Sequence, residues 1–197
     1  MPADEVERWR VFVAVEIPDP VRDALTGPLA SLQQLGDVIR INPVDRMHLT
    51  LHFLGHLPRP IVEQLAPALA PVVARHRRFA LTAQGVGAFP AMARPRVLWA
   101  GITGADLPRL NAVQAELGVA LRAASVNLEG ERFHPHLTLG RVRRPLRPPE
   151  RPPLYDWTAR WGAAIFGEVP VDRVRLMRSH LGGGPPRYTT LATFDLQ

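Results

Sequence analysis

The sequence contains no cysteine, no lysine and no long uninterrupted apolar run. Without cysteine there can be no disulfide, no thiolate zinc site and no cysteine nucleophile. Without lysine there can be no lysyl-adenylate, no lysine Schiff base and no P-loop lysine. No stretch approaches the roughly 18 apolar residues of a membrane span, and residues 1–10 are too polar for a signal peptide. We therefore expect a cytoplasmic protein that does not interact with a membrane.

All 24 basic residues are arginine, and against 18 acidic residues they give a formal net charge of +6. Genomic base composition is the simplest explanation for arginine in place of lysine. The positive charge still favours an anionic partner, because guanidinium groups pair bidentately with phosphate. RNA and nucleotides are therefore the leading candidates.

The length of 197 residues suits one domain, 1–197, or two small lobes that share a core. Apolar periodicity predicts strands at 10–17, 38–41, 47–54, 79–86, 96–101, 132–142, 164–166, 171–180 and 187–196. It predicts helices at 20–35, capped by Asp19, and at 61–75, 107–123 and 154–162. Gly55 is expected to end the third strand, residues 141–153 to form a loop, and 182–186 a hairpin turn. The order strand, helix, strand, strand, helix, strand occurs roughly twice, which indicates an α+β fold of two similar lobes around a cleft.

The tetrapeptide His-Leu-Thr-Leu occurs once in each half, at 48–51 and at 136–139. Alternate side chains of a strand share a face, so each copy has a polar and an apolar face. The polar faces carry His48, Thr50 and His52 in the first copy and His134, His136 and Thr138 in the second. The apolar faces, expected in the core, carry Leu49, Leu51 and Phe53 in the first copy and Phe133, Leu137 and Leu139 in the second.

Three interpretations of these polar faces compete. In the first they are ordinary solvated strand residues, although the repetition of the motif argues against chance. In the second the histidines bind a metal, but neither motif has an acidic ligand nearby or a familiar ligand spacing. That metal site would consist of His48, His52, His134 and His136.

The third interpretation is metal-free phosphoester chemistry. Hydrolysis of a cyclic phosphodiester needs a base for water and an acid for the departing oxygen, and imidazole suits both roles with its ordinary pKa of about 6.5. The threonine hydroxyls would donate hydrogen bonds to the nonbridging oxygens. The residues alone do not decide which histidine is the acid.

Segments throughout the chain support a family resemblance. They are RVFVAVEIP (10–18), HLTLHFLG (48–55), PRVLWAG (95–101), FHPHLTLGR (133–141), and RVRLMRSHL (173–181) followed by a glycine loop and Tyr188. In this order they resemble the two-histidine phosphoesterase superfamily, and within it the RNA 2′,3′-cyclic phosphodiesterases once named 2′-5′ RNA ligases. The paired His-x-Thr motifs are the specific part of the resemblance.

The resemblance implies a bilobal fold with antiparallel sheets around a central cleft. It also implies opening of RNA 2′,3′-cyclic phosphate ends to 2′-phosphates without a metal, ATP or any other cofactor. His48 then matches the proton donor and His136 the proton acceptor. Thr50 and Thr138 match the phosphate-holding hydroxyls, and Arg141 is an additional candidate for a phosphate or RNA contact.

Further candidate substrate contacts are less specific, and a solvated or structural role is open for each. They are His52, His134, Arg143 and Arg144, with Arg147 and Arg151 in the same arginine-rich loop as the last two.

Two other functions stay open: a ligase that runs the reverse reaction on RNA ends, and a non-catalytic RNA-binding module. The RNA could be a tRNA fragment, an oligonucleotide or a small cyclic nucleotide, and a monomer is expected.

Overall fold

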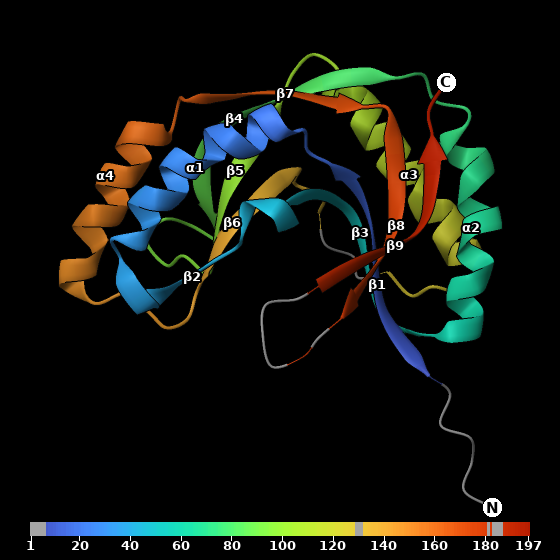
Figure 1. Cartoon of the computed structure of the whole chain (residues 1–197), viewed down its shortest axis with the longest axis horizontal. Coiled ribbons are helices and arrows are strands. Elements are labelled where there is room, and N and C mark those ends of the chain that lie inside the picture. Colours follow the sequence, from blue (N-terminus) through green and yellow to red (C-terminus); the bar gives the residue numbers. More distant parts are fainter. Residues whose placement is uncertain (1–6, 129–131, 181, 183–186) are drawn as a thin grey trace, which may run out of the picture.

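The computed structural model describes residues 7–128, 132–180, 182 and 187–197. Its strands are β1 (Arg8–Glu16), β2 (Ile39–Ile41), β3 (His48–Pro58), β4 (Phe79–Phe89), β5 (Val97–Thr103), β6 (His136–Val142), β7 (Ile165–Val171), β8 (Arg173–His180) and β9 (Arg187–Asp195). Its α-helices are α1 (Asp19–Gln33), α2 (Arg59–Val73), α3 (Leu107–Ala123) and α4 (Arg151–Trp161). The strands form one curled sheet in the order β7-β4-β5-β6-β3-β1-β8-β9, with β2 paired to β6 (Figure 1).

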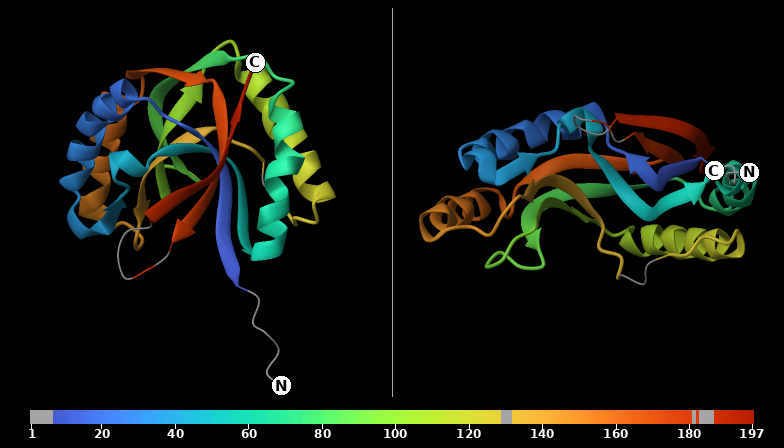
Figure 2. Two further views of the ribbon diagram at one scale, coloured as in Figure 1. Left: turned by 45° about the vertical axis from the view of Figure 1, so that its right-hand side comes forward. Right: turned by 90° about the horizontal axis from the view of Figure 1, so that it is seen from below.

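Apart from β2, the described strands form two four-stranded halves that meet where β3 pairs with β6. All the strand pairings are antiparallel, and β3 and β6 share a single register pair, Leu49 with Leu137. Helix α1 packs beside α4 and α2 beside α3 (Figure 2): the first pair contacts β7 and β4 in one half of the sheet, and both helices of the second pair contact β3 in the other. The expected α+β fold of two related halves with antiparallel strands is confirmed.

Helices α2 and α3 form because each has one apolar face that the sheet buries. Helix α3 buries Leu110, Leu117 and Leu121 completely, as its 3.6-residue period predicts, and each buried leucine contributes about 1.5–3 kcal/mol. Helix α2 runs through Pro67 and Pro71. Both prolines lie on its exposed side, so burial of the opposite face offsets the hydrogen bonds that they remove.

Two predicted ends of elements are wrong. Strand β3 continues past Gly55 to Pro58, because Gly55 adopts a positive φ of 70° beside a register shift against β1, and so forms a bulge rather than an end. Asp19 does not cap α1. The N-cap position is held by Pro18, and the Asp19 carboxylate instead accepts a hydrogen bond from Arg22 at 2.6 Å.

The second motif strand is shorter than predicted. Strand β6 begins at His136, so Phe133 and His134 precede it, although Phe133 still packs partly buried against the core. The arginine-rich loop is also shorter, because a 3₁₀ turn at Pro148–Glu150 leads directly into α4. Prolines are tolerated in the first turn of α4, where no backbone N–H is needed.

Most of the predicted hairpin turn at 182–186 lies outside the described residues. Within the described part of the chain, no helix combines the length and apolar character that crossing a membrane requires.

Candidate active site

The two His-x-Thr motifs lie side by side at the junction of the two halves. Because Leu49 is in register with Leu137 and the strands are antiparallel, His48 lies beside Thr138, and Thr50 beside His136. The two histidines are therefore diagonal neighbours on one face; in a regular antiparallel pair such neighbours lie about 7–8 Å apart, with their Cβ atoms somewhat closer. Both leucines are fully buried beneath them. Each half of the molecule thus contributes one imidazole and one hydroxyl to the same place.

Both imidazoles are held by the carbonyl oxygen two residues upstream. His48 Nδ1 lies 2.9 Å from the oxygen of Arg46, and His136 Nδ1 lies 2.6 Å from that of His134. A carbonyl oxygen can only accept, so Nδ1 carries the hydrogen in each ring. This fixes Nε2 as the nitrogen that can take up or release a proton.

Aromatic rings surround His48. Its imidazole stacks on Phe12 with ring centroids 4.6 Å apart and contacts the edge of Tyr188 at 5.3 Å. Burial lowers the pKa of His48, and the nearby charge of His136 lowers it further. Burial also raises the pKa of the Tyr188 hydroxyl, so Tyr188 stays a neutral hydrogen-bonding group.

His136 has a different neighbourhood. Phe89 meets its ring edge-on at 5.0 Å. Burial lowers the pKa of His136, and the positive charges of Arg141 and His134 act in the same direction. Both histidines are therefore neutral over a wider pH range than a free imidazole, and a bound anion would favour their protonated forms.

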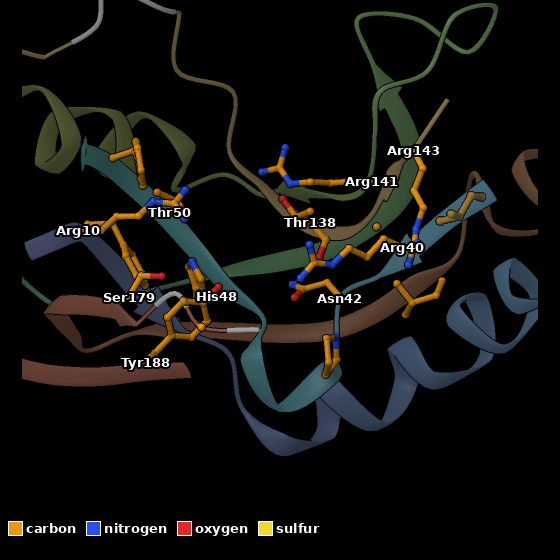
Figure 3. A pocket seen from close by; sticks show the side chains of 17 residues that line it. Arg10, Arg40, Asn42, His48, Thr50, Thr138, Arg141, Arg143, Ser179 and Tyr188 are labelled. Carbon is orange, nitrogen blue, oxygen red and sulfur yellow. The ribbon is translucent and has the colours of Figure 1, made fainter. Parts of the chain in front are cut away.

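A cavity of about 900 Å³ opens beside His48, Thr50 and Thr138. Its lining includes four arginines and, among the described residues, no carboxylate; the arginines are Arg10, Arg40, Arg141 and Arg143. Figure 3 shows Arg10 and Tyr188 on the side of His48, with Arg40 and Arg143 on the opposite side.

Two of these arginines face each other directly. Arg40 on β2 is the register partner of Arg141 on β6. Like charges opposite each other on neighbouring strands are destabilising, and a bound anion would remove this repulsion. The cavity is thus suited to a polyanion.

A β-bulge separates His52 from the site. Thr50 pairs with Ala14 and His52 with Val13, which leaves Leu51 as an extra residue on β3. The bulge turns His52 to the helix-covered face, where Nε2 donates a hydrogen bond to the backbone oxygen of Gln114 at 2.7 Å. The prediction that His52 shares the face of His48 is therefore wrong, and a metal site of four histidines is not formed.

The same bulge brings Phe53 onto the cleft face. Its side chain lines the arginine-rich cavity and is 47% exposed, with the Arg10 guanidinium 4.7 Å from the centre of the ring. The prediction that Phe53 belongs to the core is wrong, because the alternation of faces shifts by one residue at the bulge.

The remaining candidates divide between two environments. Arg143 lines the arginine-rich cavity, and exposed His134 lines a second cavity beside His136. Arg144 instead makes two hydrogen bonds to Glu150, at 2.9 and 2.6 Å, and its guanidinium helps to lower the pKa of Glu150 to about 2. Arg144 therefore organises its own loop.

Several cavity residues escaped the sequence analysis. Arg10 and Phe12 alternate on β1, and their i, i+2 spacing could have indicated a shared face. Arg40 and Asn42 carry no such signal, because only the pairing of β2 with β6 brings them to the site. Among the described residues, no group of three or more histidine, aspartate or glutamate side chains is arranged to bind a metal ion.

A curled antiparallel sheet with a His-x-Thr unit from each half at its centre is the architecture of a two-histidine phosphoesterase. Comparison with known proteins identifies the family: the model of the 2′-5′ RNA ligase superfamily matches residues 11–183. The chain belongs to this superfamily, and the expectation that it is an enzyme is confirmed.

Similar proteins cover from three quarters of the chain to nearly all of it. A protein of Archaeoglobus fulgidus named RNA 2′,3′-cyclic phosphodiesterase is 31% identical, over 94% of this chain and 99% of its own length. A protein of Aeropyrum pernix with the same name is 33% identical, over 75% and 80% respectively. Among solved structures, Escherichia coli LigT complexed with 3′-AMP has a TM-score of 0.72 at 22% identity, over 96% of this chain and 99% of that one.

Proposed function

We propose that this protein hydrolyses the 2′,3′-cyclic phosphate ends of RNA to 2′-phosphomonoesters. The observation that carries the proposal is the matched pair of histidines, each with Nδ1–H fixed on a carbonyl and Nε2 available, diagonal to each other beside an arginine-rich cavity. The names of the relatives support the same substrate class.

In the proposed reaction, His136 Nε2 takes a proton from water as the water oxygen attacks phosphorus. The bond between phosphorus and the 3′-oxygen breaks, and protonated His48 gives its Nε2 proton to that oxygen. The product carries a 2′-phosphate and a free 3′-hydroxyl. The assignment of acid to His48 and base to His136 follows the family resemblance.

The threonines and Arg141 would stabilise the charge that builds on the phosphoryl oxygens. The hydroxyls of Thr50 and Thr138 lie on the same face as the histidines and line the cavity, where they can donate to the two nonbridging oxygens. Arg141 adds a positive charge at the same cavity. A bound phosphate also opposes the burial effect on the pKa of His48 and so favours the protonated form that the acid role requires.

The arginine-rich cavity supports RNA as the substrate, because several guanidinium groups can meet successive phosphates. A single domain over 1–197, a monomer, a location in the cytoplasm and a tRNA fragment or oligonucleotide as the physiological substrate stay predictions. A non-catalytic RNA-binding module would have no use for two oriented imidazoles.

The deciding experiment is incubation of the protein with an oligonucleotide that ends in a 2′,3′-cyclic phosphate, in excess chelator and without ATP. We expect complete conversion to a 2′-phosphate end, identified by chromatography against 2′- and 3′-phosphate standards. A 3′-phosphate product would show that the 2′-oxygen departs, which contradicts the proposed cleavage of the bond between phosphorus and the 3′-oxygen. Joined RNA ends without hydrolysis would favour the ligase, and activity lost in chelator but restored by zinc or manganese would contradict a metal-free reaction.

A further inference from the structure

A second cavity, of about 410 Å³, shares His136 with the proposed active site. It lies over the half of the sheet opposite His48, on the same face. Gln84 of β4 is in register with Gly101 of β5, and Gly101 is in register with His136 of β6. These three residues form one row across neighbouring strands, so their side-chain positions face the same side.

Two glycines let the Trp99 indole lie close to the sheet. Gly101 separates Gln84 from His136 in this row, and a Cβ atom on it would lie 2.7 Å from the backbone oxygen of Gln84 and 3.4 Å from Cζ3 of the indole. Gly87 is the register partner of Trp99, and a Cβ atom on Gly87 would lie 2.4 Å from Cη2 of the indole. The indole therefore lies directly against the backbone of β4, and only glycine permits this approach.

The cavity lining combines two aromatic side chains, Phe89 and Trp99, with aliphatic residues and a small number of polar groups. Phe89 adjoins Trp99 with ring centroids 5.3 Å apart. The Thr103 hydroxyl donates a hydrogen bond to Gln84 Oε1 at 3.2 Å, which leaves the amide N–H groups of Gln84 to act as donors. Trp99 Nε1 is buried and has no hydrogen-bond partner among the described residues.

The charges of the two cavities differ. Four arginines line the first, whereas the described lining of the second has no arginine, aspartate or glutamate. The first therefore suits phosphates. The second suits a flat, uncharged ring with hydrogen-bonding edges, and its volume lies within the usual range for small-molecule sites, about 300–1,000 Å³.

We propose that the second cavity binds the nucleobase of the terminal nucleotide, with Trp99 as the stacking surface and Gln84 as a hydrogen-bond donor. The preceding phosphodiesters of the RNA then occupy the arginine-rich cavity, so the reacting phosphate at His48 and His136 lies between base and chain. This inference rests on the proposed function and adds the direction in which the RNA lies.

Two small substrates test the proposal: adenosine 2′,3′-cyclic phosphate, and 1-O-methylribose 2,3-cyclic phosphate, which has no base. Stacking on an aromatic side chain contributes about 1–3 kcal/mol per base, so Trp99→Leu should raise the KM for the adenosine substrate about tenfold or more. The KM for the substrate without a base should change less than about twofold, and Trp99→Phe should retain most of the affinity for adenosine.

The matched control is Trp9→Leu, which removes a tryptophan that packs between Arg59 and Arg178; it should leave both KM values unchanged. Gln84→Leu provides an independent variant, which should selectively weaken binding of the adenosine substrate. Equal losses on both substrates, or no loss on either, would overturn the base site while leaving the hydrolase intact.

A binding measurement separates this inference from the proposed function. If the wild-type protein hydrolyses neither small substrate, the oligonucleotide assay still tests the proposed function, and calorimetric titration with adenosine 2′-monophosphate tests the cavity. Binding that weakens about tenfold in Trp99→Leu supports the base site, and equal affinity in the two proteins rejects it.

Discussion

At the scale of single residues, the two imidazoles share the same hydrogen-bonded nitrogen but have different neighbours. His48 lies between Phe12 and Tyr188, whereas His136 lies near Arg141 and His134. Burial is the main cause of the lowered pKa at both rings, and a positive charge adds to it in each case, so these shifts do not decide which histidine is the acid. The aromatic neighbours of His48 carry no charge of their own.

These roles can be separated with a substrate whose leaving group needs no proton. His48→Ala should reduce opening of the RNA cyclic phosphate at least about a hundredfold, the lower range for acid–base catalysis, yet largely spare a nitrophenyl phosphodiester. His136→Ala should impair both, because water must still lose a proton. The measurement is kcat/KM for each variant on both substrates. If His136→Ala is the variant that the nitrophenyl ester rescues, the roles are reversed.

The threonines give a second residue-scale prediction. Thr50→Ala or Thr138→Ala removes a hydroxyl that we propose donates to a nonbridging oxygen, so kcat should fall by roughly one to three orders of magnitude. Thr→Ser at the same positions keeps the hydroxyl and should retain much more activity. Alanine and serine variants with the same kcat would show that the methyl group and its packing matter instead.

At the scale of elements, the bulge at Leu51 turns His52 towards α3, and α3 provides a glycine at the point of contact. A Cβ on Gly118 would lie 3.2 Å from Cε1 of His52, tighter than an ordinary van der Waals contact. Gly118 therefore makes room within a helix for the imidazole of β3, although glycine costs about 1 kcal/mol of helix propensity relative to alanine.

A double-mutant cycle tests this contact. Gly118→Ala in the wild-type protein gains helix propensity but crowds His52, so the net change in the free energy of unfolding should be small. In a His52→Ala background the crowding is absent, and the same substitution should stabilise by about 1 kcal/mol more than it does in the wild type. Denaturant unfolding of the four proteins measures the difference. Identical effects in both backgrounds would show that the two side chains do not interact.

The bulge also explains where prediction from the sequence failed. The strands and helices were predictable because Leu110, Leu117 and similar residues repeat with the period of their element, and the paired motifs pointed to the site because they recur. Strict alternation assigned His52 and Phe53 to the wrong faces, because an extra residue at Leu51 is visible only in the pairing with β1. Arg40 joined the site through a contact between strands that are distant in sequence.

At the scale of the whole molecule, the arginine-rich cavity should control binding of the RNA chain rather than the reaction itself. Arg40→Gln and Arg143→Gln together should weaken oligonucleotide binding and reduce the slope of log K against log salt, by about 0.7 for each lost phosphate contact. Hydrolysis of a cyclic mononucleotide should change little. Fluorescence titration at several salt concentrations measures the slope.

The control for this experiment is Arg75→Gln, which removes one positive charge at the end of α2, where Arg75 pairs with Glu116. If Arg75→Gln reduces the slope as much as Arg40→Gln alone or Arg143→Gln alone, then the overall charge of the protein, not the cavity, determines RNA binding.

The single register pair between Leu49 and Leu137 has a further consequence, which concerns symmetry. In the proposed reaction, the phosphate would lie between two identical His-x-Thr units, one from each half of the sheet. Hydrolysis of a cyclic diester has a direction, since one ester oxygen stays and the other leaves, and two identical units offer the same groups to both oxygens. The protein breaks this symmetry with Tyr188 on one side and with Arg141 and the second cavity on the other, which can orient the unsymmetrical nucleotide. Which of the two oxygens departs is thus determined by the surroundings of the motifs, not by the motifs themselves.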